Sequence, residues 1–123
     1  MAKKILIADD EADVLAILEK KLKQKEFEVL ALSRGKEIIA RAKEFQADLL
    51  VLDVIMPDSD GYEVGKQLRQ DKEFRTTPII YMTGKELEYN GMVRRTEELG
   101  YCDFVTKPCT FDELLEKIQK ALE

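Results

Sequence analysis

The 123-residue sequence contains no histidine. Histidine is the commonest general base and the commonest zinc ligand in proteins, so its absence excludes much of the usual repertoire of enzyme chemistry. Any chemistry must rely on carboxylates, hydroxyls and lysines. The two cysteines, Cys102 and Cys109, form neither a CxxC pair nor part of a metal-ligand cluster. We expect both to be reduced thiols.

Long apolar runs are also absent. No stretch approaches the roughly 18 consecutive apolar residues that a membrane span needs, and the first residues lead into Ile5–Ile7 without a signal-peptide core. These absences predict a cytoplasmic protein with no membrane partner. A net charge of −5 and an isoelectric point near 5.0 argue against direct binding of nucleic acid through the overall field.

The length predicts one domain, spanning residues 1–123. An apolar content of 45% suffices for a single contiguous core. No repeat, low-complexity tract or linker interrupts the sequence. Because the predicted elements extend from about Lys3 to Glu123, we expect a stand-alone domain with no attached output domain.

Apolar segments of strand length alternate with segments of helical periodicity. Five strands are predicted at Ile5–Ala8, Phe27–Leu32, Leu49–Val54, Ile79–Met82 and Tyr101–Val105. Helical spacing appears at Val14–Leu22, Ile38–Phe45, Val64–Leu68, more loosely at Leu87–Leu99, and at Phe111–Leu122. Thr110 and Glu113 have the spacing of a capping box at the start of the last helix. Asp60-Gly61 precedes the third helix, and Pro78 precedes the fourth strand.

The alternation predicts an α/β fold of the flavodoxin-like, doubly wound (βα)5 type. Near-continuous apolar strands are typical of a parallel sheet that helices cover on both faces. Right-handed crossovers leave few topologies, and five strands suit the order 2-1-3-4-5. In such sheets, ligands bind beyond the carboxyl ends of the strands.

Polar residues follow four of the predicted strands at that edge. Asp9 and Asp10 follow the first strand, Asp53 ends the third, Thr83 follows the fourth and Lys107 comes shortly after the fifth. We therefore expect three carboxylates, a hydroxyl and an ammonium group to converge. Taken alone, Thr83-Gly84 and Lys107-Pro108 are weak evidence for a functional site, since both dipeptides also occur in ordinary turns.

Three neighbouring carboxylates repel one another unless a cation neutralises them or some take up protons. Mg²⁺ prefers oxygen ligands and binds one or two carboxylates together with a phosphate, so Asp9, Asp10 and Asp53 are candidate metal ligands. Alternatively, Asp9, Asp10 and Glu11 only cap the first helix. Asp53 is also a candidate nucleophile toward phosphorus. Lys107 and Thr83 would then contact the phosphoryl oxygens.

In this combination the sequence closely resembles the receiver domain of bacterial response regulators over essentially its whole length. The blocks that carry the resemblance are Asp9-Asp10, Asp53 to Gly61, Met82-Thr83-Gly84, Phe104 and Thr106-Lys107-Pro108.

This resemblance implies that Asp53 is phosphorylated by a histidine kinase or a histidine phosphotransfer protein, with Mg²⁺ as cofactor. Asp10, Asp53 and the backbone carbonyl of Ile55 would ligate the metal directly, and Asp9 through water. Lys107 would pair with a phosphoryl oxygen. Such a domain is a phosphoacceptor switch that catalyses only its own phosphorylation and dephosphorylation, not an enzyme acting on other substrates.

The resemblance also implies a conformational switch. Thr83 would move toward the phosphoryl group and Phe104 would rotate inward, which stabilises one of two pre-existing arrangements. The readout would be the surface of the fourth helix, fifth strand and fifth helix, where an unidentified protein binds. The domain would be a monomer or a phosphorylation-dependent dimer.

Three departures from the family pattern stand out. The stretch from Thr83 to Lys107 is about two residues longer than usual, near residues 86–91. Tyr101 stands where a small residue is common. Ile55 and Lys85 occupy positions that tune the lifetime of the phosphorylated state, so that lifetime does not follow from the resemblance.

Three alternatives remain. One is a degenerate receiver that acts only as a docking module. The second is a phosphatase of the aspartate-nucleophile class, which has a second acid two residues beyond the nucleophile, where this sequence has Ile55. The third is a flavodoxin-like flavin or nucleotide binder, which needs a phosphate-binding loop where the sequence has Asp9-Asp10-Glu11.

Overall fold

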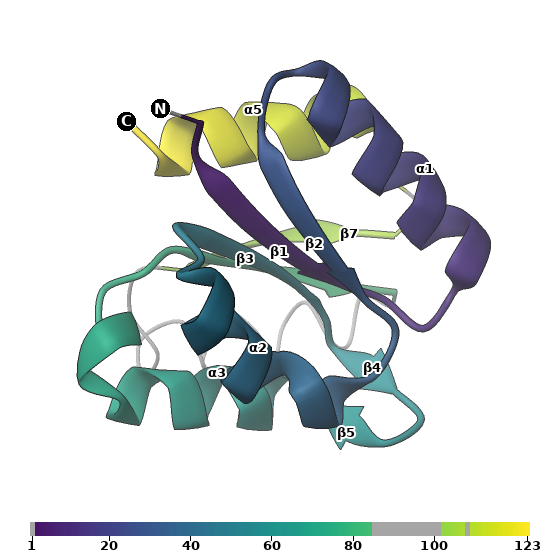
Figure 1. Cartoon of the computed structure of the whole chain (residues 1–123). Helices are drawn as coiled ribbons and strands as arrows, with labels where there is room; N and C mark the ends of the chain where they lie inside the picture. Colours follow the sequence, from purple (N-terminus) through teal and green to yellow (C-terminus); the bar gives the residue numbers. More distant parts are fainter. Residues whose placement is uncertain (1, 85–101, 108) are drawn as a thin grey trace.

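The computed structural model describes residues 2–84, 102–107 and 109–123. Five parallel strands form its main sheet in the order β2-β1-β3-β6-β7 (Figure 1). They are β1 (Lys4–Ala8), β2 (Glu28–Leu32), β3 (Leu49–Asp53), β6 (Ile79–Thr83) and β7 (Cys102–Thr106). Because β6 and β7 are the fourth and fifth strands of this sheet along the chain, the predicted order 2-1-3-4-5 and the flavodoxin-like fold are confirmed.

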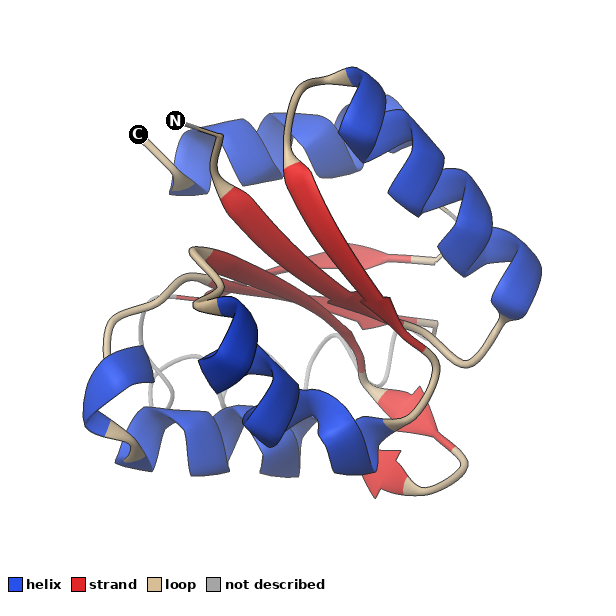
Figure 2. Cartoon of the chain, viewed as in Figure 1, coloured by secondary structure: helices blue, strands red, loops and turns tan. Residues whose placement is uncertain are grey.

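Helices cover both faces of the sheet (Figure 2). On one face lie α1 (Ala12–Gln24) and α5 (Phe111–Ala121), and on the other α2 (Ile38–Phe45) and α3 (Gly61–Gln70). Each pair packs into its own apolar cluster against alternate side chains of the strands. The predicted fourth helix, Leu87–Leu99, lies outside the described residues.

The central strands are buried on both sides, which explains their apolar runs. Every residue of β3 and β6 is buried, whereas the edge strand β2 is mostly half-exposed. Burying a strand on both faces leaves no place for polar alternation. The polar residues Asp53 and Thr83 therefore appear only where these two strands end.

Side chains cap the starts of two helices, at the predicted capping box of Thr110 and at Asp60, which the sequence places before the third helix. The Asp60 carboxylate accepts a hydrogen bond from the Tyr62 amide at the start of α3 (2.8 Å). The Thr110 hydroxyl accepts one from the Glu113 amide at the start of α5 (3.1 Å). Both contacts satisfy backbone donors that the first helical turn leaves without a partner.

A short hairpin between β3 and α3 was not among the predicted elements. There, β4 (Ile55–Met56) and β5 (Ser59–Asp60) pair as a small antiparallel hairpin. The Asp58 carboxylate at its turn accepts hydrogen bonds from the backbone amides of Gly35 (3.0 Å) and Lys36 (3.1 Å). Gly35 and Lys36 belong to the short 3-10 helix η1 (Gly35–Glu37), and a second one, η2 (Lys72–Phe74), follows α3.

Several predicted strand ends were wrong by one residue. The second strand begins at Glu28 instead of Phe27, and the third ends at Asp53 instead of Val54. The fourth and fifth strands extend one residue further, to Thr83 and Thr106. A strand ends where its pairing with the neighbouring strand ends. The apolar character of a segment alone does not predict that pairing.

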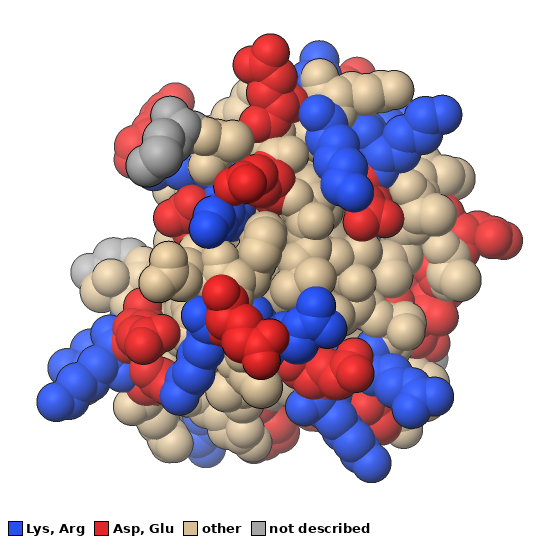
Figure 3. Space-filling view, viewed as in Figure 1, with Lys and Arg blue, Asp and Glu red and all other residues tan. Residues whose placement is uncertain are grey.

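The surface carries both signs of charge. On the face shown in Figure 3, lysine and arginine side chains are interspersed with aspartate and glutamate, without a broad basic area. No helix in the described part of the chain combines the length and apolar character that crossing a membrane requires.

Candidate functional site

Four strand ends carry polar residues at the carboxyl edge of the sheet. Asp9 follows β1, Asp53 ends β3, Thr83 ends β6 and Lys107 follows β7. Asp9 and Thr83 are fully buried, and Asp53 is 5% exposed. The parallel sheet explains this arrangement, because its strands all end at the same edge.

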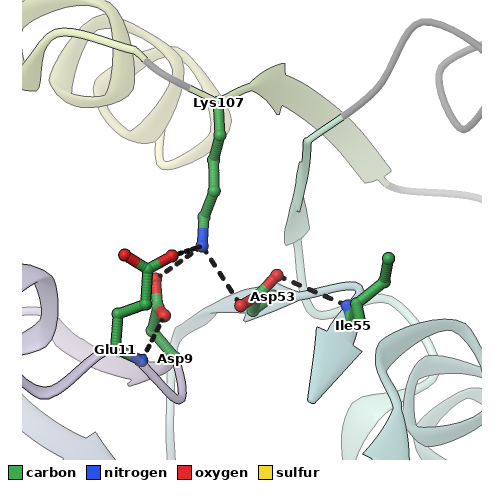
Figure 4. Close-up of polar contacts among 5 residues, drawn as sticks. All are labelled: Asp9, Glu11, Asp53, Ile55 and Lys107. Atoms are coloured by element: carbon green, nitrogen blue, oxygen red, sulfur yellow. Dashed lines mark hydrogen bonds and ion pairs between the residues drawn. The ribbon is translucent and has the colours of Figure 1, made fainter.

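Lys107 links the two buried carboxylates (Figure 4). Its ammonium nitrogen lies 3.1 Å from Asp53 Oδ2, to which it donates a hydrogen bond, and 3.0 Å from Asp9 Oδ2 in an ion pair. It also lies 3.6 Å from Oε1 of the exposed Glu11. The Glu11 contact could not be predicted from the sequence, since that residue follows the acidic pair and precedes a helix.

The site contains more negative than positive charge. Burial raises the pKa of Asp53 to about 6; the hydrogen bond and charge of Lys107 oppose the rise, and Asp9 and Asp10 add to it. Burial alone would lower the pKa of Lys107, but hydrogen bonds and charge from Asp9 and Asp53 raise it above its ordinary value. One ammonium group therefore does not neutralise the neighbouring carboxylates.

The carboxylates are close enough to share a cation. Asp9, Asp10 and Asp53 each offer an oxygen, and these three oxygens lie within 4.8 Å of one another. Asp10 is exposed, so the cluster opens to solvent on one side. Hard oxygen donors with open coordination positions suit Mg²⁺, which keeps several of its waters.

The helix-capping alternative for the acidic residues is not supported. Glu11 occupies the N-cap position of α1 and makes no capping hydrogen bond with its side chain. Asp9 Oδ1 accepts a hydrogen bond from the Glu11 amide (2.9 Å), while Oδ2 faces Lys107. Asp9 thus orients the start of the β1–α1 loop and belongs to the polar cluster as well.

The loop after Asp53 packs against the backbone of that residue. The Ile55 amide lies 3.4 Å from Asp53 Oδ1 and donates to it, and the Ile55 side chain is 60% exposed. A Cβ added to Gly61 would stand 2.4 Å from the Asp53 carbonyl oxygen and 2.9 Å from Val54 Cα. Only glycine allows this close approach.

The remaining predicted residues lie on β6 and β7. The carbonyl of Thr83 accepts a hydrogen bond from the Lys107 amide, so the two strand ends are held together. Phe104 is half-buried in β7, and the Lys117 ammonium lies 5.7 Å from the centre of its ring. Lys117 also pairs with Asp103 (3.2 Å). Lys85 and Pro108 lie outside the described residues.

Fold and site together define a class of protein. It is a flavodoxin-like α/β domain with a carboxylate–lysine cluster and room for a cation at the carboxyl edge of its sheet. The family model of the response regulator receiver domain matches residues 5–119. The chain belongs to this family. Receiver domains are switches of two-component signalling, not classical enzymes, and they generally bind Mg²⁺.

Known relatives agree with this assignment. The chain is 38% identical over 122 residues to the alkaline phosphatase synthesis transcriptional regulatory protein PhoP of Bacillus subtilis. The match covers 99% of this chain and 49% of that relative, so the chain spans about half the relative's length.

Solved structures of similar proteins share the whole fold. The chemotaxis response regulator CheY4 of Vibrio cholerae has a TM-score of 0.89 at 25% identity, over 99% of this chain and 100% of that one. A response regulator described as putative, from Chloroflexus aurantiacus, has a TM-score of 0.87 at 29% identity, over 99% and 98% of the two chains.

Proposed function

We propose that residues 1–123 form a phosphoacceptor domain in which Asp53 receives a phosphoryl group from a histidine kinase or histidine phosphotransfer protein. The observation that carries this proposal is the position of Asp53. Its carboxylate is buried at the end of β3, hydrogen-bonded to Lys107 and within 4.8 Å of two further carboxylates. Phosphoryl transfer needs positioning and positive charge more than covalent chemistry. The end of the buried strand positions Asp53, and Lys107 places one positive charge beside it.

In the proposed reaction an Asp53 oxygen forms a bond to phosphorus. The bond between phosphorus and the imidazole nitrogen of the donor breaks, and its electron pair stays on that nitrogen. Lys107 already contacts Asp53 Oδ2, so its ammonium group lies beside the new phosphoryl group and pairs with one of its oxygens. Thr83, at the adjacent strand end, supplies a hydrogen bond to another.

The donor set fits Mg²⁺, which we propose is held by Asp10, Asp53 and the backbone carbonyl of Ile55, and by Asp9 through water. The ion, when bound, neutralises negative charge on the phosphoryl oxygens. The excess negative charge of the cluster supports this assignment, since the Lys107 ammonium group contacts only Asp9 and Asp53 among the three carboxylates whose oxygens lie within 4.8 Å of one another.

The output of the switch follows from Thr83 and Phe104. We infer that Thr83 moves toward the phosphoryl group and that Phe104 rotates into the space it leaves. Such a shift would change the surface formed by the predicted fourth helix, β7 and α5, where we propose that a protein partner binds. Lys117 of α5 already contacts the Phe104 ring, which supports coupling between this ring and the helix. The domain acts as a monomer or as a phosphorylation-dependent dimer.

The test is incubation with acetyl phosphate and Mg²⁺, followed by intact-mass measurement. We expect one added phosphoryl group on the wild-type chain and none on Asp53→Asn. Omission of Mg²⁺ or addition of a chelator should prevent the addition. An unmodified wild type would favour the docking-module alternative, and an adduct that persists on Asp53→Asn would place the acceptor elsewhere.

A further inference from the structure

One side chain ties the turn of the β4–β5 hairpin to a distant part of the chain. Asp58 Oδ1 accepts a hydrogen bond from the Gly35 amide (3.0 Å), and Asp58 Oδ2 accepts one from the Lys36 amide (3.1 Å). Both amides belong to η1, which leads directly into α2, and the hairpin lies beside the beginning of that helix (Figure 1). The two hydrogen bonds lower the pKa of Asp58, so each oxygen of an ionised carboxylate engages one amide.

Close packing accompanies these hydrogen bonds. A Cβ added to Gly35 would stand 1.9 Å from Ser59 Oγ and 3.4 Å from Met56 Cε. The backbone of η1 therefore lies against both strands of the hairpin. Ile38, the first residue of α2, is fully buried in the same apolar cluster as Met56. Because α2 is anchored in the core, η1 gives the hairpin a fixed support.

The other end of the hairpin is held next to Asp53. The Gly61 amide donates a hydrogen bond to the Val54 carbonyl (2.8 Å), and Gly61 packs against the backbone of Asp53. Ile55 belongs to β4, between this end of the hairpin and the turn at Asp58. The backbone of Ile55 is therefore restrained from both sides.

The segment that receives Asp58 also supports the acidic pair. The Asp9 amide donates a hydrogen bond to the carbonyl of Leu32, the last residue of β2 (3.1 Å). Residues 32–36, which we call the brace, thus contact the loop after β1 through Asp9 and the hairpin through Asp58. The brace connects the two segments that carry most of the proposed magnesium ligands.

A backbone carbonyl is a useful ligand only where the chain keeps it in place. Mg²⁺ demands nearly octahedral geometry, with ligand distances of about 2.0–2.1 Å. The side chains of Asp10 and Asp53 can adjust to the ion by rotation, whereas the carbonyl of Ile55 moves only with the backbone of the hairpin. The position of this carbonyl therefore depends on whatever anchors the hairpin.

We propose that Asp58 is a positioning residue of the magnesium site. By fixing the hairpin to the brace, it keeps the Ile55 carbonyl where the proposed ligand set needs it, and it does not contact the ion itself. The inference rests on the proposed function, because it takes the magnesium ligands from there. It adds a residue whose effect on Mg²⁺ binding is carried entirely by the backbone.

Magnesium titration of metal-free protein, followed by the NMR shifts of backbone amides, tests this role. We expect the Kd for Mg²⁺ to rise about tenfold in Asp58→Ala, as is common when a residue that orients a metal ligand is lost. Asp58→Asn keeps one oxygen that can accept a hydrogen bond, so its Kd should lie between those of wild type and Asp58→Ala. The increase should persist at high salt, which screens any effect of the lost charge alone.

The matched control is Asp71→Ala. The Asp71 carboxylate likewise accepts a hydrogen bond from a backbone amide of a 3-10 helix, that of Glu73 in η2 (3.0 Å), and its pKa is also lowered. It lies outside the brace and the hairpin. This variant should lose stability and keep the wild-type Kd for Mg²⁺, which separates positioning of the ligands from a general loss of stability.

The possible results distinguish this inference from the proposed function. A folded Asp58→Ala that binds Mg²⁺ as tightly as wild type would overturn the role of Asp58 and leave the ligand set intact. An increase in Kd that disappears at high salt, or that Asp71→Ala shares, would also overturn it. If Asp58→Ala does not fold, the milder Asp58→Asn decides, and an unchanged Kd in that variant would overturn the role. A wild type that binds no Mg²⁺ would remove the proposed magnesium site itself.

Discussion

Lys107 Nζ lies 3.1 Å from Asp53 Oδ2, although 54 positions separate the two residues in the chain. This hydrogen bond joins the ends of β3 and β7 across β6. It also affects the charge state of Asp53, because burial raises the pKa of this residue while Lys107 opposes that rise. Several consequences of this relationship can be measured without phosphorylating the protein.

Replacing the ammonium group should raise the pKa of Asp53. In metal-free protein, Lys107→Met removes the hydrogen bond and the charge that favour the ionised carboxylate, so the Asp53 pKa should move above its present value of about 6. The measurement is an NMR titration of the side-chain carboxyl groups. The control is Lys117→Met, which removes an ammonium group paired with Asp103. An Asp53 pKa that falls or stays constant in Lys107→Met would contradict the geometry.

Asp53 should also make stability depend on pH. Its pKa is about 6 in the folded chain, against an ordinary value of 3.8, so the folded state binds more protons between these values. The free energy of unfolding therefore loses a contribution on the order of 2 kcal/mol as the pH rises through this window. The Asp53→Asn variant lacks this pH-dependent contribution to stability. Because the other carboxylates are common to both proteins, the difference between them reports on Asp53.

Denaturant unfolding of metal-free protein at pH 4.5 and 7.5 measures this effect. Relative to wild type, Asp53→Asn should gain stability at the higher pH. An advantage of Asp53→Asn that is the same at both pH values, or larger at the lower one, would show that the buried carboxylate does not titrate as described.

Magnesium should stabilise the fold through the acidic cluster. A ligand that binds only the native state adds about 2.7 kcal/mol at a concentration 100 times its dissociation constant. We expect Mg²⁺ to raise the unfolding midpoint of wild type and to have a much smaller effect on Asp10→Asn. The matched control is Asp13→Asn, an exposed carboxylate on α1 outside the cluster. Equal Mg²⁺ stabilisation of wild type and Asp10→Asn would remove Asp10 from the ligand set.

Gly61 should tolerate no side chain. In Gly61→Ala the new Cβ meets the backbone of Asp53 and Val54, and overpacking of this kind costs about 1–3 kcal/mol. Gly84→Ala is the comparison, since a Cβ there meets no atom of the described residues within 4 Å. Denaturant unfolding should separate the two variants. Equal stabilities would show that the loop between Asp53 and Gly61 relaxes freely.

Much of the fold follows from local sequence patterns. Continuous apolar runs predict buried parallel strands, and parallel strands that end together predict that Asp9, Asp53 and Lys107 converge, as the structure shows. This inference needs only the direction of the strands. It does not need the position of any single side chain.

Features that depend on side-chain placement were missed. The β4–β5 hairpin is too short for a periodic signal, and its anchor, the Asp58 carboxylate, bonds to backbone amides 22 and 23 positions away. The Glu11–Lys107 contact depends on side-chain conformations that a sequence pattern does not encode.

The most direct test of the central proposal is chemical trapping of the acceptor. Borohydride reduces an acyl phosphate to an alcohol, so protein treated with acetyl phosphate and Mg²⁺ should carry homoserine in place of Asp53 after reduction. Peptide sequencing by mass spectrometry locates the change. We predict homoserine at position 53 alone; reduction at another aspartate with position 53 intact would contradict the assignment of Asp53 as the phosphoryl acceptor.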